Sequence, residues 1–286
     1  MTEWDGKGLV STAWLEAHLG DPVFDATVHL LPATPGPYRV ESGRADYENA
    51  HIPGAAFLDL AHDFSDHKSS LGFTMPAVED FATACGKAGI GPKTRVVVYS
   101  AQSPMWATRF WWMLHACGFD NAAVLDGGFG KWQAEGRPSE AGTHSYSPET
   151  LSLSAQPGAW ADKDDVLAAI DDGAVCTINA LSPSLHDGTS KTNYGRKGHI
   201  KGSRNVPYAS LLKEDGSYRD DEELRSFYEA VGAFEKPRAI CYCGGGISAT
   251  MNALALTRLG HPSVAVYDGS MSEWTRDPDL PMETGA

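Results

Sequence analysis

The sequence lacks an apolar run of the roughly 20 residues that a membrane-spanning helix needs, so no membrane association is expected. Its N-terminus, MTEWDGKGLV, lacks a basic segment followed by an apolar one, and no secretory signal peptide is therefore expected. Basic residues are also scarce: 23 lysines and arginines stand against 37 acidic residues, which gives a net charge of −14. A field of that sign repels phosphate backbones, so nucleic acid is not an expected partner.

Cysteine is infrequent and unpatterned in the sequence. The five residues are Cys85, Cys117, Cys176, Cys241 and Cys243. Their odd number and wide scatter argue against a disulfide framework and indicate a reducing compartment, so we expect the protein in the cytoplasm. There is no Cys-x-x-Cys pair and no histidine cluster at ligand spacing, and we therefore predict no metal and no other cofactor.

The same pattern occurs twice along the chain. RVVVYSAQSPMWATRFWWML in the first half and RAICYCGGGISATMNALAL in the second each consist of an arginine, an apolar run, a tyrosine, a short turn and a helical pattern. VLDGGFGKW and VYDGSMSEW follow them, and AHIPGAAFLDL and GHIKGSRNVPY precede them. Equivalent residues, such as Ser100 and Cys243, are separated by 142 to 148 positions. This repetition predicts a duplicated domain.

Within each half, apolar segments of β-type composition alternate with amphipathic ones, as in AICYC followed by SATMNALALTRLG. The alternation predicts an α/β fold in which each domain is a parallel sheet flanked by helices. Residues 133–158 are rich in serine, proline, glycine and glutamate and lack helical periodicity. We predict an N-terminal domain over 1–140, a linker over 141–158 and a C-terminal domain over 159–286, with the boundary near residue 150.

Cys243 stands where the second copy passes from a predicted strand to a predicted helix. The loop after it consists of Gly244, Gly245, Gly246, Ile247 and Ser248. Chemistry on parallel sheets takes place at the carboxyl ends of strands. A loop with few side chains can turn several N–H groups inward, and the helix N-terminus adds partial positive charge, so a thiolate and an anionic adduct are both favoured. The alternative is a buried, inert cysteine, which is our interpretation of the other four.

The nearest competing chemistry is hydrolysis of a phosphate monoester by a Cys-x5-Arg loop, whose arginine clamps two phosphate oxygens. The residue six positions after Cys243 is Ala249, and no arginine or lysine lies between Cys243 and Thr257. A phosphate dianion would lack its clamp, which excludes this reaction. A small neutral loop suits a smaller group, such as one additional sulfur atom.

These residues resemble the tandem-domain rhodanese family of sulfurtransferases. The shared segments are HIPGA, GHIKGSRNVP, the WW pair at 111–112, DGGFGKW and YDGSMSEW, which keep the family's order over nearly the whole chain. In that family the first domain is catalytically silent and the second carries the nucleophile, which fits Ser100 in the place of Cys243. The resemblance implies two rhodanese-like domains and a sulfurtransferase.

The resemblance further implies a two-step reaction. The Cys243 thiolate attacks the sulfane sulfur of a small-molecule donor and becomes a persulfide, which the loop amides stabilise. Cyanide or a thiol then accepts the outer sulfur, with a thioredoxin-like reductant as one candidate. Because the duplication supplies an interface within the chain, we expect a monomer.

The loop composition bears on the donor. Members that use thiosulfate resemble Cys-Arg-Lys-Gly-Val-Thr, and members that use 3-mercaptopyruvate resemble Cys-Gly-Ser-Gly-Val-Thr. Here the loop is Cys-Gly-Gly-Gly-Ile-Ser, whose lack of cations favours 3-mercaptopyruvate, with thiosulfate as the alternative. Ser248 matches the family threonine, for which orienting a proton and capping the helix are both open. Three positions depart from the mercaptopyruvate pattern: Gly245 replaces a loop serine, Ala61 a relay aspartate and Leu185 a substrate-binding arginine.

Two arginines are candidates for substrate binding. Arg196 matches one of the two carboxylate-binding arginines of the family. Arg109, at the start of RFWWML, matches a further family arginine, and an interdomain ion pair is its alternative role. His186 and Lys197 are candidate replacements for the arginine missing at Leu185, and a solvated surface role is the alternative for both.

Four other polar residues are predicted to be structural. His51 and His199 each fix a turn. Asp126 and Asp268, in the two DG turns, are expected to cap neighbouring amides.

A second class of function remains open, because residues of the family pattern are missing at Gly245 and Leu185. In this class the duplicated fold is a binding module, or a redox sensor that uses the thiol of Cys243.

Overall fold

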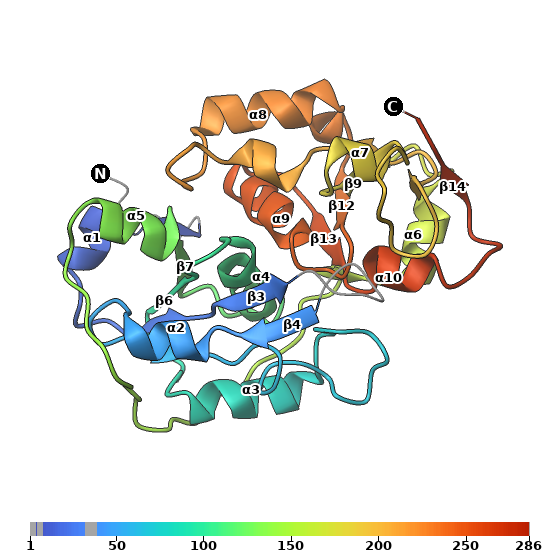
Figure 1. Cartoon of the computed structure of the whole chain (residues 1–286). Helices are drawn as coiled ribbons and strands as arrows, with labels where there is room; N and C mark the ends of the chain where they lie inside the picture. Colours follow the sequence, from blue (N-terminus) through green and yellow to red (C-terminus); the bar gives the residue numbers. More distant parts are fainter. Residues whose placement is uncertain (1–3, 5–7, 32–38, 286) are drawn as a thin grey trace.

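The computed structural model describes residue 4 and residues 8–31 and 39–285 of the chain (Figure 1). Each half forms a five-stranded parallel sheet, which confirms the predicted α/β class and the duplication. The first sheet has the strand order β1-β7-β6-β2-β5, with β1 (Leu9–Val10), β2 (Val23–Asp25), β5 (Ala56–Phe57), β6 (Val96–Tyr99) and β7 (Ala122–Leu125). Its helices are α1 (Thr12–Glu16), α2 (Arg44–Asn49), α3 (Val78–Lys87), α4 (Met105–His115) and α5 (Gly128–Ala134).

The second sheet repeats that order as β8-β13-β12-β9-β11. Its strands are β8 (Trp160–Ala161), β9 (Val175–Asn179), β11 (Arg204–Asn205), β12 (Arg238–Tyr242) and β13 (Val264–Tyr267). Its helices are α6 (Lys163–Ala169), α7 (Pro183–His186), α8 (Asp221–Ala230), α9 (Ala249–Arg258) and α10 (Ser270–Trp274), with 3-10 turns at Tyr208–Leu211 and Ala233–Glu235.

Strand β6 shows why the central strands consist of consecutive apolar residues and do not alternate between apolar and polar ones. Val96 and Val98 pack in a cluster with α3 and α4, whereas Val97 and Tyr99 pack on the opposite face with α1, α2 and α5. Successive side chains of a strand point to opposite faces, and both faces are covered by helices here. A parallel strand buried on both sides therefore requires a continuous apolar run.

Short edge elements were not predicted from the sequence. The two-residue strands β1, β5, β8 and β11 are too short to show a period of two. Two antiparallel pairs were also missed: β3 (Val28–Leu31) with β4 (Arg39–Ser42), and β10 (His199–Ile200) with β14 (Met282–Glu283). Over the described ranges, no helix is both long and apolar enough to cross a membrane.

The two domains share one interface, at which α4 and α9 pack against each other between the sheets (Figure 1). A single cluster of buried side chains runs from the first domain into the second, and it includes Phe110 of α4 and Leu254 of α9. This continuous apolar contact fixes the carboxyl end of β12 relative to the first domain.

The segment between α5 and β8 has no helix or strand, as its composition predicted, but it is docked on the first domain. The backbone N–H of Glu149 donates to Gly86, and that of Gln156 donates to Ala116. The Tyr146 hydroxyl donates to the carbonyl of Gly54 and accepts from the N–H of Val23. Backbone and side-chain bonds thus hold this segment where it has no regular structure of its own.

Candidate active site

Cys243 directly follows β12 at the carboxyl end of the second sheet, and only 2% of it is exposed. The other four cysteines are buried and free, as predicted. Burial raises the pKa of Cys117 and of Cys176 to about 11, and it raises the pKa of Cys85 and Cys241 further. These four thiols are therefore neutral at physiological pH.

The carbonyl groups of the loop after Cys243 are held on one side by α10. The carbonyl of Cys243 accepts from the N–H of Met271 at 3.1 Å. The carbonyl of Gly244 accepts both from the N–H of Ser272 at 2.8 Å and from its hydroxyl at 2.7 Å. Because C=O and N–H of a planar trans peptide point in opposite directions, the N–H of Gly245 points away from α10.

Several loop amides are available for a ligand. Gly245, Ile247 and Ser248 have backbone N–H groups without an acceptor among the residues that the structure describes. They lie at the N-terminus of α9, where the helix dipole favours negative charge. This arrangement suits an anion on the sulfur of Cys243.

Ser270 binds two backbone amides of the loop, a role that was not predicted from the sequence. Its hydroxyl accepts from the N–H groups of Cys243 and Gly246, both at 3.1 Å, and donates to the carbonyl of Tyr267. Its φ of 48° is in the left-handed region, where the equivalent Gly128 of the first copy has φ 57°. A serine at a position that needs a glycine conformation was the available signal.

The three glycines of the loop differ in the space that is available for a side chain. A Cβ on Gly244 would lie 2.2 Å from the Cζ of Tyr194, and a Cβ on Gly246 would lie 2.6 Å from the carbonyl oxygen of Asp268. Gly246 also has φ 73°. A Cβ on Gly245 would meet only the hydroxyl of Ser272, at 3.8 Å. The ring of Tyr194 therefore excludes a side chain at Gly244, the backbone itself excludes one at Gly246, and Gly245 has room for one.

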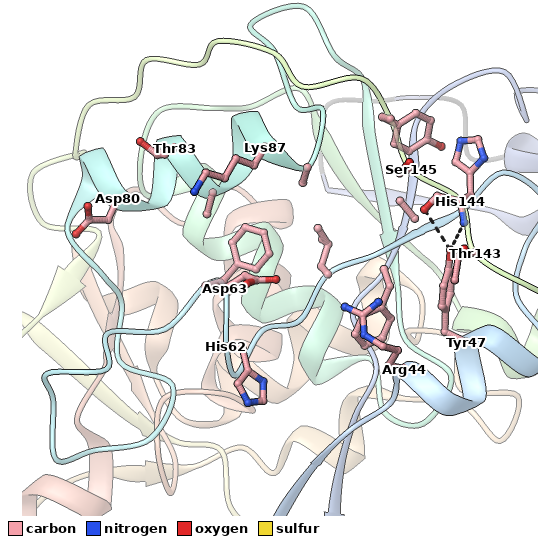
Figure 2. A pocket seen from close by; sticks show the side chains of 17 residues that line it. Arg44, Tyr47, His62, Asp63, Asp80, Thr83, Lys87, Thr143, His144 and Ser145 are labelled. Carbon is pink, nitrogen blue, oxygen red and sulfur yellow. Dashed lines mark hydrogen bonds between the residues drawn. The ribbon is translucent and has the colours of Figure 1, made fainter.

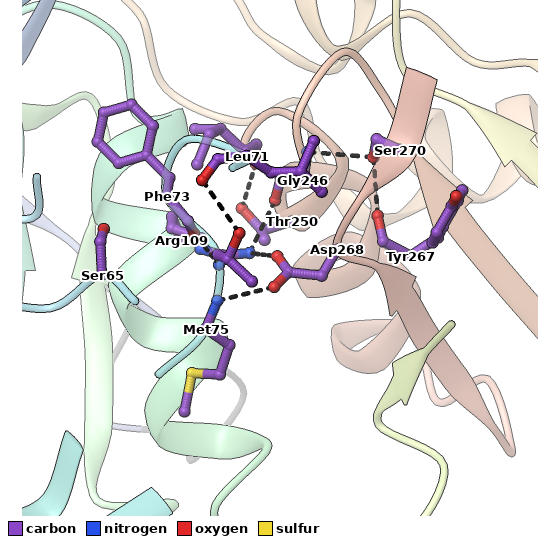
Figure 3. Close-up of polar contacts among 12 residues, drawn as sticks. Ser65, Leu71, Phe73, Met75, Arg109, Gly246, Thr250, Tyr267, Asp268 and Ser270 are labelled. Carbon is purple, nitrogen blue, oxygen red and sulfur yellow. Dashed lines mark hydrogen bonds and ion pairs between the residues drawn. The ribbon is translucent and has the colours of Figure 1, made fainter. Parts of the chain in front are cut away.

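Arg109 reaches this loop from α4 of the first domain, and 1% of it is exposed. Its guanidinium donates to the Oδ1 of Asp268 at 2.7 Å, to the carbonyl of Gly246 at 3.2 Å and to the carbonyl of Phe73 (Figure 3). The N–H of Met75 donates to the other carboxylate oxygen of Asp268 at 2.7 Å. Arg109 thus has the interdomain ion pair named above as its alternative role, and its direct contact with substrate stays a prediction.

The expectation that Asp126 and Asp268 cap neighbouring amides was wrong. Asp268 accepts from Met75, and Asp126 accepts from the N–H of Tyr218 at 2.7 Å, so each aspartate binds the other domain. Side-chain capping by Ser248 was also wrong, because its hydroxyl makes no hydrogen bond to the first turn of α9.

Arg196 lies in the segment before β10 and is half-buried. Its Nη1 donates to the carbonyls of Asp277 at 3.0 Å and Leu280 at 2.9 Å. These bonds use one end of the guanidinium, and substrate binding by Arg196 stays a prediction. Tyr194, two residues earlier, lies against Gly244 of the loop.

Ala61 and Leu185, two of the positions that depart from the family pattern, lie outside the Cys243 loop. Ala61 lies in a turn after β5, and the nearby Asp59 bonds Ser42 and His62 instead. Leu185 lies in α7.

Of the two candidates to replace the arginine missing at Leu185, His186 does not have the surface role named as its alternative. His186 is buried and stacks on His199 with ring centroids 3.7 Å apart, and burial lowers the pKa of His186 to about 4. Lys197 is exposed.

The two histidines expected to be structural both bond backbone carbonyls near the end of a helix, and their role in fixing turns stays a prediction. The Nδ1 of His51 bonds the carbonyl of Tyr47, and the Nδ1 of His199 bonds the carbonyl of His186, both at 2.8 Å.

A separate cavity of about 550 Å³ lies in the first domain between α2, α3 and residues 143–146 (Figure 2). Its polar lining includes Arg44, His62, Asp63, Lys87 and His144, and no residue of the Cys243 loop belongs to it.

Within the described part of the chain, no three His, Cys, Asp or Glu side chains are grouped to hold a metal ion.

Two segments of the chain, residues 12–135 and 162–277, match the Rhodanese-like domain family. The chain belongs to the rhodanese family. The 3-mercaptopyruvate sulfurtransferase of Escherichia coli strain K12 is 33% identical over 96% of this chain and 97% of its own length. The mitochondrial thiosulfate/3-mercaptopyruvate sulfurtransferase 1 of Arabidopsis thaliana is 33% identical over 96% of this chain and 78% of its own.

Solved structures of rhodanese proteins agree with this assignment. SseA from Escherichia coli, a 3-mercaptopyruvate sulfotransferase, superposes with a TM-score of 0.77 at 31% identity, covering 92% of this chain and 98% of that chain. The chain is thus a tandem-domain rhodanese and an enzyme of the sulfurtransferase class.

Proposed function

We propose that this rhodanese transfers a sulfur atom from 3-mercaptopyruvate to cyanide or a thiol through a persulfide on Cys243. The supporting observation is the loop geometry: Cys243 begins a loop in which α10 binds the carbonyls of Cys243 and Gly244 and Arg109 binds that of Gly246. The amides of Gly245 and Ile247 have no acceptor among the described residues. Such amides stabilise negative charge where it develops.

In the first step the Cys243 thiolate attacks the sulfur of 3-mercaptopyruvate. An S–S bond forms and the C–S bond breaks, so its electron pair passes to carbon. That carbon takes up the proton of the substrate thiol, which yields pyruvate and a persulfide anion. In the second step cyanide attacks the outer sulfur, which yields thiocyanate and restores the thiolate; a thiol acceptor takes the same sulfur.

The surroundings of Gly244 support 3-mercaptopyruvate over thiosulfate as the main donor. The ring of Tyr194 fills the volume that a cationic side chain at position 244 would enter, and residues 244–248 carry no charge. A thiosulfate dianion therefore meets no loop cation, whereas the single carboxylate of mercaptopyruvate needs less compensation.

The free cysteines support a reducing compartment such as the cytoplasm as the place of action. The extensive packing of α4 on α9 supports a monomer, since the two domains already cover each other's interface.

The test is a mass measurement on intact protein after incubation with each donor. We expect a gain of one sulfur atom with 3-mercaptopyruvate, its loss on addition of cyanide, and no gain in Cys243→Ser. Cys241→Ala, a change at a fully buried strand residue, is the matched control and keeps the gain. No gain with either donor contradicts the proposal.

Steady-state kinetics distinguish the alternatives. A higher kcat/KM for thiosulfate than for 3-mercaptopyruvate shows that thiosulfate is the main donor. Oxidation of Cys243 by peroxide without turnover of either donor supports a redox-sensing module instead.

A further inference from the structure

Arg109 belongs to the first domain, yet it holds the backbone of the Cys243 loop. One Nη1 group bonds both the carbonyl of Gly246 and the carboxylate of Asp268. Its guanidinium carbon lies 4.8 Å from the ring centroid of Trp160 in the second domain. A buried cation is stable only when it is paired and hydrogen-bonded. The two terminal nitrogens of Arg109 meet these conditions, whereas its buried Nε has no partner among the described residues.

The bond to Gly246 determines the direction of the next amide. The carbonyl of Gly246 and the N–H of Ile247 belong to one peptide plane and point in opposite directions. Because Arg109 binds that carbonyl, the Ile247 N–H faces away from Arg109, and it has no acceptor among the described residues. Figure 3 shows the guanidinium of Arg109 with its bonds to Gly246 and Asp268.

The first copy supplies an internal comparison. Asp126 accepts from Tyr218 as Asp268 accepts from Met75, so both halves of the interface have an aspartate–amide bond. At the spacing of 142 positions that relates Thr108 to Thr250, the residue equivalent to Arg109 in the second copy is Met251, whose fully buried side chain carries no charge. The interdomain arginine is therefore present only where it meets the loop that carries the cysteine, and interface stability alone does not account for it.

We propose that Arg109 is a positioning residue of sulfur transfer: it holds the Gly246 carbonyl outward and thereby aims the Ile247 amide at the persulfide. This inference rests on the proposed function. The role is indirect, since Arg109 acts through the loop peptide. It gives the first domain, which has Ser100 in place of the cysteine, a part in the reaction of the second.

The experiment compares Arg109→Lys, Arg109→Met and Asp268→Asn with the parent, and uses Asp126→Asn as the matched interface control. We expect kcat for 3-mercaptopyruvate to fall by about tenfold or more in Arg109→Met, because an amide aimed at developing charge is lost, with KM within about twofold. Arg109→Lys keeps the cation and retains part of the rate. The pH profile of Cys243 alkylation by iodoacetamide should move to higher pH in Arg109→Met and stay unchanged in Asp126→Asn.

The outcomes separate the two proposals. Absence of a persulfide in the parent overturns the proposed function. A parent that forms the persulfide, with folded Arg109 variants whose kcat and alkylation profile equal those of the parent, overturns the positioning role alone. Circular dichroism checks folding; if the Arg109 variants unfold, Asp268→Asn decides, because it removes the anionic partner of Arg109 and keeps an acceptor for Met75. An equal loss in Asp126→Asn also overturns positioning and indicates a general effect of the interface.

Discussion

The side-chain hydroxyls of Thr108 and Thr250 lie 2.8 Å apart, and both residues are fully buried. Thr108 is in α4 and Thr250 in α9, separated by 142 positions, so they are equivalent residues of the two copies. The duplicated helices therefore meet at the same point of their surfaces, as in the self-complementary interface of a twofold dimer. The asymmetric contacts of Arg109 are added to this symmetric contact.

Replacement of this hydroxyl pair tests the interface. A carbonyl also lies within hydrogen-bond distance of each hydroxyl: that of Met105 in α4 for Thr108, and that of Ile247, just before α9, for Thr250. We therefore expect Thr108→Val and Thr250→Val each to lower the free energy of unfolding by about 1 kcal/mol, since the remaining hydroxyl keeps one partner. Urea unfolding of both single variants and the double variant measures the coupling, which we expect at about 0.5 kcal/mol or more. Strict additivity would show that the hydroxyls do not interact.

Substitution by serine should change the free energy of unfolding much less at Gly245 than at Gly246. Gly245→Ser has room for its side chain, and we expect a change in the free energy of unfolding within about 0.5 kcal/mol and continued persulfide formation. Gly246→Ser is expected to cost more than about 2 kcal/mol, because its positive φ and the nearby Asp268 carbonyl both oppose a side chain. Thermal unfolding and persulfide mass measure both; similar losses in the two variants would refute the steric difference.

Gly244 should be coupled to Tyr194. Gly244→Ala places a methyl group into the tyrosine ring, and we expect a loss of about 1–3 kcal/mol. Tyr194→Ala removes the obstruction, so Gly244→Ala should be better tolerated in that background than in the parent. Denaturant unfolding of the four proteins gives the coupling energy. An equal cost in both backgrounds would mean that the loop backbone, and not the ring, excludes the side chain.

Asp126 should make stability depend on pH. Burial, only partly offset by the hydrogen bond from Tyr218, raises the pKa of Asp126 from 3.8 to about 6. The folded state therefore holds a proton that the unfolded state has released, and this contribution to stability is present below about pH 4 and is lost as the pH rises through 6.

Asp126→Asn removes this titration. Between about pH 5 and pH 8 the parent should lose about 1 kcal/mol more than the variant, measured by urea unfolding at both values. Parallel pH profiles of the two proteins would show that Asp126 is charged in the folded state throughout.

The central strands and Cys243 could be predicted from the sequence alone, whereas Tyr194 could not. VVVY and AICYC predicted central strands because burial on both faces requires a continuous apolar run. Cys243 was identified because a thiol at a strand end before three glycines is a local signal. Tyr194 gave no such signal, since its effect depends on the place where a distant loop lies.

The sequence by itself determined the duplication and the parallel α/β class, and it predicted Cys243 as the nucleophile, because periodicity, repeated spacing and loop composition are local properties of the chain. Only the tertiary structure decided the roles of Arg109 and Asp268. These two residues are 159 positions apart, and they meet because α4 packs on α9 and brings β12 and α10 beside the first domain. An ion pair between domains has no local pattern, so Asp268 was interpreted as a turn residue until packing placed it opposite a buried cation.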